Sequence, residues 1–152
     1  MAGFEPRRAR ASDVEAITSL VRAAYAKYVP RMGTEPMPMK ADYGEAVRRH
    51  QVWVVEEGES QIAVLELVPH GDHLLVENVA IDPARQGRGL GRGLMAFAEA
   101  EALRQGLHEM RLYTAEAMTG NIGLYARMGY AETERKTVHD IPRVYMSKRI
   151  EA

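Results

Sequence analysis

The chain has 152 residues, enough for one compact domain with its own core, and we expect residues 1–152 to form a single domain. Hydrophobic residues make up 46% and charged residues 27%, so the composition excludes a disordered or collagen-like chain. The net charge of -1 argues against general nucleic-acid binding, which needs a surplus of Lys and Arg.

The chain has no cysteine, which excludes disulfides, thiolate metal sites and a cysteine nucleophile. The five histidines are scattered without metal-ligand spacing, so we expect no metal. The N-terminal stretch has basic residues but no apolar run behind them, and no segment approaches the length of a membrane span. We therefore expect a cytoplasmic protein with no membrane partner.

The first quarter of the chain predicts a short strand, a helix and a loop. The strand is expected over residues 4–8. Ser12 and Glu15 have the spacing of a capping box, and apolar residues at helical spacing continue to about Tyr28. Three prolines and a glycine within residues 30–39 predict a loop, because proline lacks a backbone donor and disfavours helix in the residue before it.

The remaining elements follow from apolar periodicity and turn residues. Helices are expected over residues 42–49, 90–106 and 119–128, and strands over residues 52–56, 61–68, 74–81, 109–114, 133–138 and 143–150. Together with the first strand and helix, this order predicts an α/β fold with a mixed central sheet of about seven strands flanked by about four helices.

Four alternating glycines, at positions 87, 89, 91 and 93, connect a predicted strand to a predicted helix. The first turn of a helix has free N–H groups and a partial positive charge, and glycine lets a phosphate approach the backbone. Arg88 and Arg92 add charge at the same end. A tight connection alone would explain one glycine, but this pattern favours a pyrophosphate site. The spacing fits neither a Walker A loop nor a dinucleotide fingerprint.

Two motifs carry a resemblance to a known family. The segment Gln86–Gly91 matches the Gln/Arg-x-x-Gly-x-Gly/Ala signature of the GCN5-related N-acetyltransferases (GNAT), and Val79–Pro83 resembles the strand that leads into it. Asn121–Tyr130 resembles the family's Asn…Leu-Tyr-x-x-x-Gly-Phe/Tyr block. The order of elements also agrees from about residue 4 to residue 150. The resemblance implies a single N-acetyltransferase domain with the GNAT-like acyl-CoA N-acyltransferase fold.

The resemblance also implies that acetyl-CoA is the acyl donor and lies in a V-shaped gap between the fourth and fifth strands. The backbone of Val79 and Ile81 would pair with the pantetheine arm, and the amides from residue 87 to residue 92 would hold the pyrophosphate. The residues expected to contact acetyl-CoA are Val79, Ala80, Ile81, Gln86, Gly87, Arg88, Gly89, Leu90, Gly91, Arg92, Asn121 and Tyr125.

Transfer of an acetyl group to an amine needs a neutral amine, stabilisation of the oxyanion and a proton for the leaving thiolate. By resemblance, Tyr125 is the general acid and the backbone N–H of Val79 binds the oxyanion. Without the resemblance, the helical spacing of Tyr125 with Leu124 and Met128 would indicate an aromatic side chain packed in the core. Glu77 is the candidate general base, expected on the face of Val79 because it lies two residues away, with Asn78 on the opposite face. The alternative for Glu77 is an ordinary surface glutamate.

The acceptor is expected to be a primary amine of a small molecule or peptide, which attacks directly in a ternary complex. In the family, the first two helices and their loop line the acceptor side, which assigns Tyr28, Met32 and Met37 together with Glu77. Methionine suits an adaptable apolar surface. The alternative is that this loop only seals the core. Residues 136–143 are a further candidate, because the family's last hairpin often borders the cleft.

Two functions of different classes follow. The first is an active acetyltransferase, and the second is a non-catalytic acyl-CoA-binding sensor or structural module on the same fold. A degenerate module would be expected to lose the tyrosine or break the glycine signature, and both are intact, which favours the enzyme. A homodimer is possible, because the last strand could pair across a two-fold axis.

Overall fold

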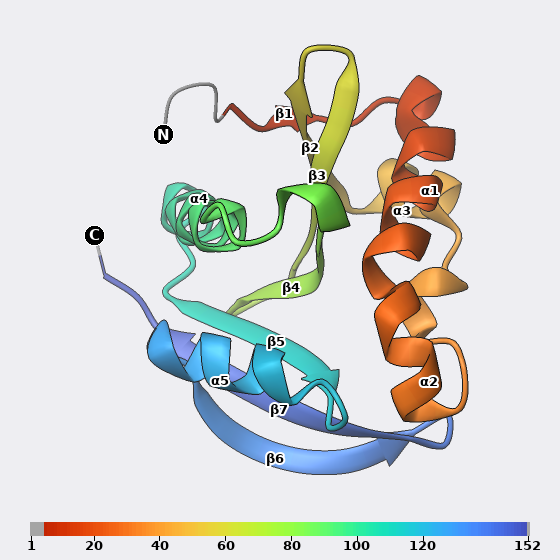
Figure 1. Ribbon diagram of the computed structural model, residues 1–152. Coiled ribbons are helices and arrows are strands. Elements are labelled where there is room, and N and C mark those ends of the chain that lie inside the picture. Colours follow the sequence, from red (N-terminus) through yellow and green to blue (C-terminus); the bar gives the residue numbers. More distant parts are fainter. Residues whose placement is uncertain (1–4, 152) are drawn as a thin grey trace.

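The computed structural model describes residues 5–151 and contains a seven-stranded mixed sheet in the order β1-β2-β3-β4-β5-β7-β6 (Figure 1). Every neighbouring pair is antiparallel except β4 and β5, which run parallel. The strands are β1 (Arg7–Arg8), β2 (Gln51–Glu57), β3 (Ser60–Pro69), β4 (Leu74–Ile81), β5 (Glu109–Ala115), β6 (Ala131–Val138) and β7 (Ile141–Arg149). The predicted mixed sheet is confirmed.

Helices cover both faces of the sheet, as predicted. They are α1 (Val14–Tyr25), α2 (Val29–Met32), α3 (Tyr43–Arg49), α4 (Leu90–Arg104) and α5 (Thr119–Arg127). In Figure 1, α1, α2 and α3 lie on one side and α4 and α5 on the other. No helix within residues 5–151 is long and apolar enough to cross a membrane.

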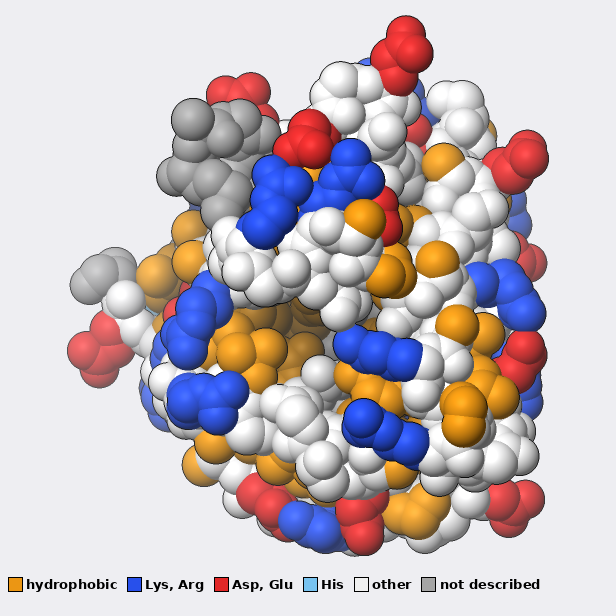
Figure 2. Space-filling view, in the orientation of Figure 1, with side chains coloured by type: hydrophobic (Ala, Val, Ile, Leu, Met, Phe, Trp, Pro, Cys, Tyr) orange, Lys and Arg blue, Asp and Glu red, His pale blue; other side chains and the backbone are white. Residues whose placement is uncertain are grey.

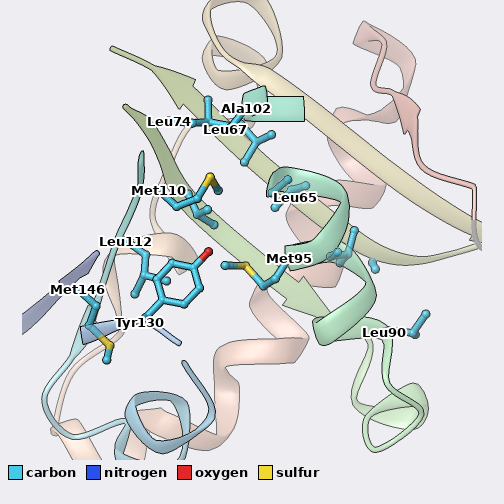
Figure 3. Close-up of a cluster of buried hydrophobic side chains, with 14 of the residues drawn as sticks. Leu65, Leu67, Leu74, Leu90, Met95, Ala102, Met110, Leu112, Tyr130 and Met146 are labelled. Carbon is cyan, nitrogen blue, oxygen red and sulfur yellow. The ribbon is translucent and has the colours of Figure 1, made fainter. Parts of the chain in front are cut away.

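Two hydrophobic clusters hold these layers together. On one face, Ile17 and Val21 of α1 are fully buried against β2 and β3. On the other face, Leu94 and Met95 of α4 pack against leucines and methionines of β3, β4 and β5 (Figure 3). Truncating a side chain as deeply buried as Leu94 to alanine would cost about 2–5 kcal/mol. The sheet between the clusters is therefore a rigid support for the loops at its edges.

Three details of the first third of the chain differ from prediction. Helix α1 does not begin with a Ser12 capping box, because the carboxylate of Asp13 accepts from the N–H of Arg10 at 2.7 Å and from the guanidinium of Arg7 at 2.9 Å. The segment predicted as a loop, residues 30–39, overlaps helix α2, whose first turn tolerates Pro30 because no N–H partner is needed there. Of the predicted first strand, only β1 is formed, and residue 4 lies outside the described residues.

Strand β4 has two irregularities that shape the rest of the molecule. It pairs with β5 only from Leu74 to Val76, so the two strands separate beyond that point (Figure 1). The β3–β4 register also shifts, because Asn78 and Val76 oppose consecutive residues of β3 and Glu77 is the extra residue. Such a bulge resets the alternation of side chains between the two faces.

The bulge corrects one sequence-based expectation. Glu77 contacts Tyr113, on the side of the sheet that carries α1 and α2, and Asn78 contacts tyrosines on that same side. Val79 packs against the cluster under α4, on the opposite side. Glu77 and Val79 therefore do not share a face, and Asn78 does not lie opposite Glu77.

Candidate active site

A cavity of about 400 Å³ lies where β4 and β5 separate, and we call it the larger cavity. Figure 2 shows the molecule from the same side as Figure 1, with a hollow in the middle of the view. Hydrophobic side chains lie inside the hollow, and Lys and Arg side chains lie around it. All the residues expected to contact acetyl-CoA line the larger cavity except Arg88. The structure thus brings together the glycine-rich turn, the end of β4 and helix α5, which are separate in the sequence.

The glycine-rich turn presents bare backbone to the larger cavity. Gly87 and Gly89 have φ values of +84° and +82°, a conformation that side chains other than glycine rarely adopt. A Cβ atom at Gly87 or Gly91 would meet no atom within 4 Å. Within the described chain, the backbone N–H groups of residues 87–92 donate no hydrogen bond, and α4 has no side-chain N-cap. This arrangement of open donors at a helix N-terminus suits a phosphate group.

Of the two arginines expected at the turn, Arg92 lines the larger cavity and Arg88 does not. Arg88 points away from the larger cavity and pairs with Glu57 at 2.8 Å. Arg92 lines the cavity and belongs to no ion pair among residues 5–151. Lys27, at the end of α1, also lines the cavity and donates to Gln86 Oε1 at 3.0 Å. Arg85 lines the cavity too but pairs with Glu57 and Asp82, so the positive charge that is not paired comes from Arg92 and Lys27.

The backbone at the end of β4 faces the gap between β4 and β5. The carbonyl oxygen of Val79 lies 3.3 Å from the hydroxyl of Tyr25, and that of Ile81 accepts from Gln86 Nε2 at 3.3 Å. Because β5 pairs with β4 only up to Val76, no neighbouring strand uses these groups. An extended ligand could pair with them as a strand would.

Tyr125 projects from α5 into the larger cavity. Its ring centroid lies 6.1 Å from that of Tyr130, and its hydroxyl makes no hydrogen bond within residues 5–151. Burial raises the pKa of Tyr125 to about 12, so the phenol keeps its proton at neutral pH. Asn121 lies one helical turn earlier and also lines the cavity, where its side-chain amide contacts Met118 Sδ at 3.6 Å.

A smaller cavity of about 50 Å³ lies next to the larger one, on the side of the sheet that carries α1 and α2. It is lined by Tyr25, Met32, Pro36, Met37, Pro38, Glu77, Tyr113, Thr114, Ala115, Met118, Ile141 and Arg143. The predicted acceptor residues Met32, Met37 and Glu77 are therefore together. Tyr28 is not with them, because it lines the larger cavity, where burial raises its pKa.

One residue joins the two cavities. Tyr25, the last residue of α1, lines both. Its hydroxyl donates to Asn78 Oδ1 at 2.7 Å, and Asn78 Nδ2 donates to the hydroxyl of Tyr43 at 3.0 Å. Tyr43 in turn donates to the carbonyl oxygen of Pro38 at 2.6 Å. This buried chain ties the acceptor-side loop to the bulge in β4.

Tyr113 was missed as a member of the smaller cavity, whereas Arg143 belongs to the segment 136–143 that was expected to border the cleft. The hydroxyl of Tyr113 donates to Glu77 Oε1 at 2.6 Å, and the guanidinium of Arg143 lies 4.2 Å from the centroid of the Tyr113 ring. Both residues belong to β-strands far from Glu77 in the sequence, and no local motif marks them. Among residues 5–151, no group of three or more His, Cys, Asp or Glu is arranged to hold a metal ion.

The model of the acetyltransferase (GNAT) family matches residues 15–130. The chain belongs to this family. A mycothiol acetyltransferase of Jonesia denitrificans is 31% identical over 101 residues, which cover 65% of this chain. The chain spans about a third, 32%, of the length of that curated relative. A second mycothiol acetyltransferase, from Nocardia farcinica, is 46% identical over 54 residues, which cover 18% of that protein.

Solved GNAT structures share the fold. The PaiA N-acetyltransferase of Thermoplasma acidophilum, in complex with coenzyme A, superposes with a TM-score of 0.82 at 16% identity, covering 95% of this chain and 98% of that one. The ribosomal-protein-S18-alanine N-acetyltransferase of Escherichia coli gives a TM-score of 0.77 at 18% identity, covering 97% and 94%. At these identities the likeness concerns the fold alone.

Proposed function

We propose that this chain is an acetyl-CoA-dependent N-acetyltransferase that transfers an acetyl group to a primary amine of a small molecule or peptide. One observation carries the proposal: a cavity with open backbone donors and a cavity with a carboxylate meet at Tyr25. Family membership and the coenzyme A complex of the PaiA N-acetyltransferase support the choice of donor.

The larger cavity fits coenzyme A by its donor set. The N–H groups of residues 87–92 would bind the pyrophosphate, and Arg92 and Lys27 would add charge at the rim. The carbonyl group of Val79 and the carbonyl and N–H groups of Ile81 would pair with the amides of the pantetheine arm, which requires Gln86 to release Ile81.

The chemistry is direct replacement of the thiol by the amine on the acetyl carbon. One proton must leave the amine and one must reach the sulfur. Glu77 would accept the first, and Tyr125, protonated at neutral pH, would deliver the second. The N–H of Val79 would donate to the carbonyl oxygen as negative charge develops there. Holding both reactants in adjoining cavities supplies a further part of the rate.

Calorimetric titration of the purified protein with acetyl-CoA, and with coenzyme A in parallel, tests the donor. We expect one saturable site for each, followed by thiol release when amines are added. Binding without thiol release across a broad amine panel would favour the non-catalytic sensor, and the absence of binding to either ligand would refute the proposal.

Three further expectations stay predictions: a single domain over residues 1–152, a cytoplasmic location and a homodimer.

A further inference from the structure

Two opposite charges stand on either side of Tyr113 in the smaller cavity. Glu77, on β4, accepts a hydrogen bond from the Tyr113 hydroxyl at 2.6 Å, and Arg143, on β7, lies over the Tyr113 ring at 4.2 Å. Neither charge belongs to an ion pair among the residues that the structure describes. Tyr113 therefore lies between the carboxylate of Glu77 and the guanidinium of Arg143, and the two groups form no ion pair with each other.

The surroundings of these two charges make their lack of ionic partners unusual. The rest of the lining is largely apolar, with Met32, Met37, Met118 and Ile141 among its members. Glu77 and Arg143 are partly buried, and a charge that loses part of its water to such a lining costs free energy unless a partner compensates it. By contrast, the neighbouring Arg111 on β5 is paired with Glu109 two residues away. A ligand that carries both a positive and a negative group would compensate both charges of the smaller cavity.

We propose that the acceptor is a small α-amino acid, whose amine is held by Glu77 and whose carboxylate is held by Arg143. This inference rests on the proposed acetyltransferase function and names its substrate class. A guanidinium offers two parallel N–H donors that match a carboxylate, and stacking on Tyr113 fixes its plane. The amine would then lie on the β4 side of the cavity, next to the residue that must accept its proton.

The size of the smaller cavity agrees with this class. A volume of about 50 Å³ corresponds to on the order of four water-sized groups, at about 10–15 Å³ each. That is room for the amine, the α-carbon and the carboxylate. Tyr113 also lines a groove of about 550 Å³ over β5, β7 and β6, which leaves space for a side chain beyond the α-carbon.

Paired acceptors that differ only in charge test the inference. We would measure kcat/KM by thiol release for alanine and alaninamide, and for glycine and glycinamide, at saturating acetyl-CoA. We expect the wild type to prefer the acid at least tenfold. Arg143→Gln should lower the acid-to-amide ratio by about tenfold to hundredfold, because a charged hydrogen-bonded pair is lost. Arg143→Lys should restore part of the ratio, and Arg149→Gln, exposed on the same strand, should leave it unchanged.

Other results would overturn the inference in distinguishable ways. Equal or better use of the amides by the wild type, or an unchanged ratio in Arg143→Gln, would refute the amino-acid acceptor while turnover still supported the acetyltransferase. Absence of turnover with every amine, despite saturable acetyl-CoA binding, would refute the proposed function and the inference with it. The acetyl-CoA affinity of Arg143→Gln, measured by calorimetry, checks that the variant is folded.

Discussion

The two adjoining cavities are built in different ways. The anion-binding part of the larger cavity comes from one continuous stretch of backbone, residues 79–92, and its donors are peptide groups. The smaller cavity comes from side chains of α1, α2, the following loop, β4, β5 and β7, which the fold brings together from across the chain. One cavity depends on glycine conformation, and the other depends on which side chains meet.

This difference has a functional consequence. A site made of backbone groups tolerates changes of neighbouring side chains, because its donors persist in every sequence that keeps the turn. A site made of converging side chains changes its ligand whenever one member changes. We therefore expect substitutions in the larger cavity to affect donor affinity, and those in the smaller cavity to affect the choice and activation of the acceptor.

The largest expected effect is that of Tyr125→Phe, because it removes the proposed general acid while keeping the ring. We expect kcat to fall by on the order of 10³, with acetyl-CoA affinity within about twofold. Since burial raises the pKa of Tyr125 to about 12, the phenol holds its proton below that pH, and wild-type kcat should show no alkaline loss from Tyr125 up to about pH 10.

Tyr130→Phe is the matched control for that variant. Tyr130 packs against Tyr125 but lies outside both cavities and donates to Glu99 at 3.0 Å. Its kcat should stay near the wild-type value. A Tyr125→Phe enzyme with wild-type kcat would transfer the acid role to another group and leave Tyr125 as a wall of the larger cavity.

Glu77→Gln should have the next largest effect, and it tests the acceptor side. We expect kcat to fall by on the order of 10² at the acidic end of the activity range, and less at alkaline pH, where the amine is already neutral. Acetyl-CoA affinity should hardly change. Glu132→Gln, an exposed carboxylate on β6, serves as control. A pH profile that matches wild type would exclude Glu77 as the base.

Gly87→Val tests whether backbone conformation builds the larger cavity. Both Gly87 and Gly58 have positive φ and open space where a Cβ would stand, but only Gly87 lies at the cavity. We expect Gly87→Val to weaken acetyl-CoA binding by about tenfold to hundredfold in calorimetry, through lost backbone contacts. Gly58→Val carries similar backbone strain without that loss. Equal affinities in the two variants would place the pyrophosphate elsewhere.

The larger cavity could be predicted from the sequence because its signal is local. Glycines at alternate positions 87 and 89 specify the left-handed turn, and the segment Asn121–Tyr130 marks α5. What the sequence could not indicate was pairing over distance. Arg88 and Arg92 look equivalent at the start of α4, yet Arg88 is neutralised by Glu57 at the end of β2.

The smaller cavity could be predicted only in part. The family resemblance assigned Met32 and Met37 to the acceptor side, but the bulge at Glu77 leaves no trace in the apolar pattern of β4, so alternation gave the wrong face. Tyr113 and Arg143 lie on strands whose order in the sheet does not follow the chain. Which side chains converge there depends on register, and register needs the three-dimensional structure.

The smallest expected effect belongs to the residue that the two cavities share. Tyr25→Phe removes the hydroxyl that bonds Asn78, beside the bulge, so we expect both the Kd for acetyl-CoA and the KM for the amine to rise by about threefold to tenfold. Tyr28→Phe, which changes the larger cavity alone, should raise only the Kd. If Tyr25→Phe changed only the Kd for acetyl-CoA or only the KM for the amine, the Tyr25 hydroxyl would contribute to one cavity alone. Donor binding and acceptor binding would then be separable in this protein, because the buried bond to Asn78 would not couple them.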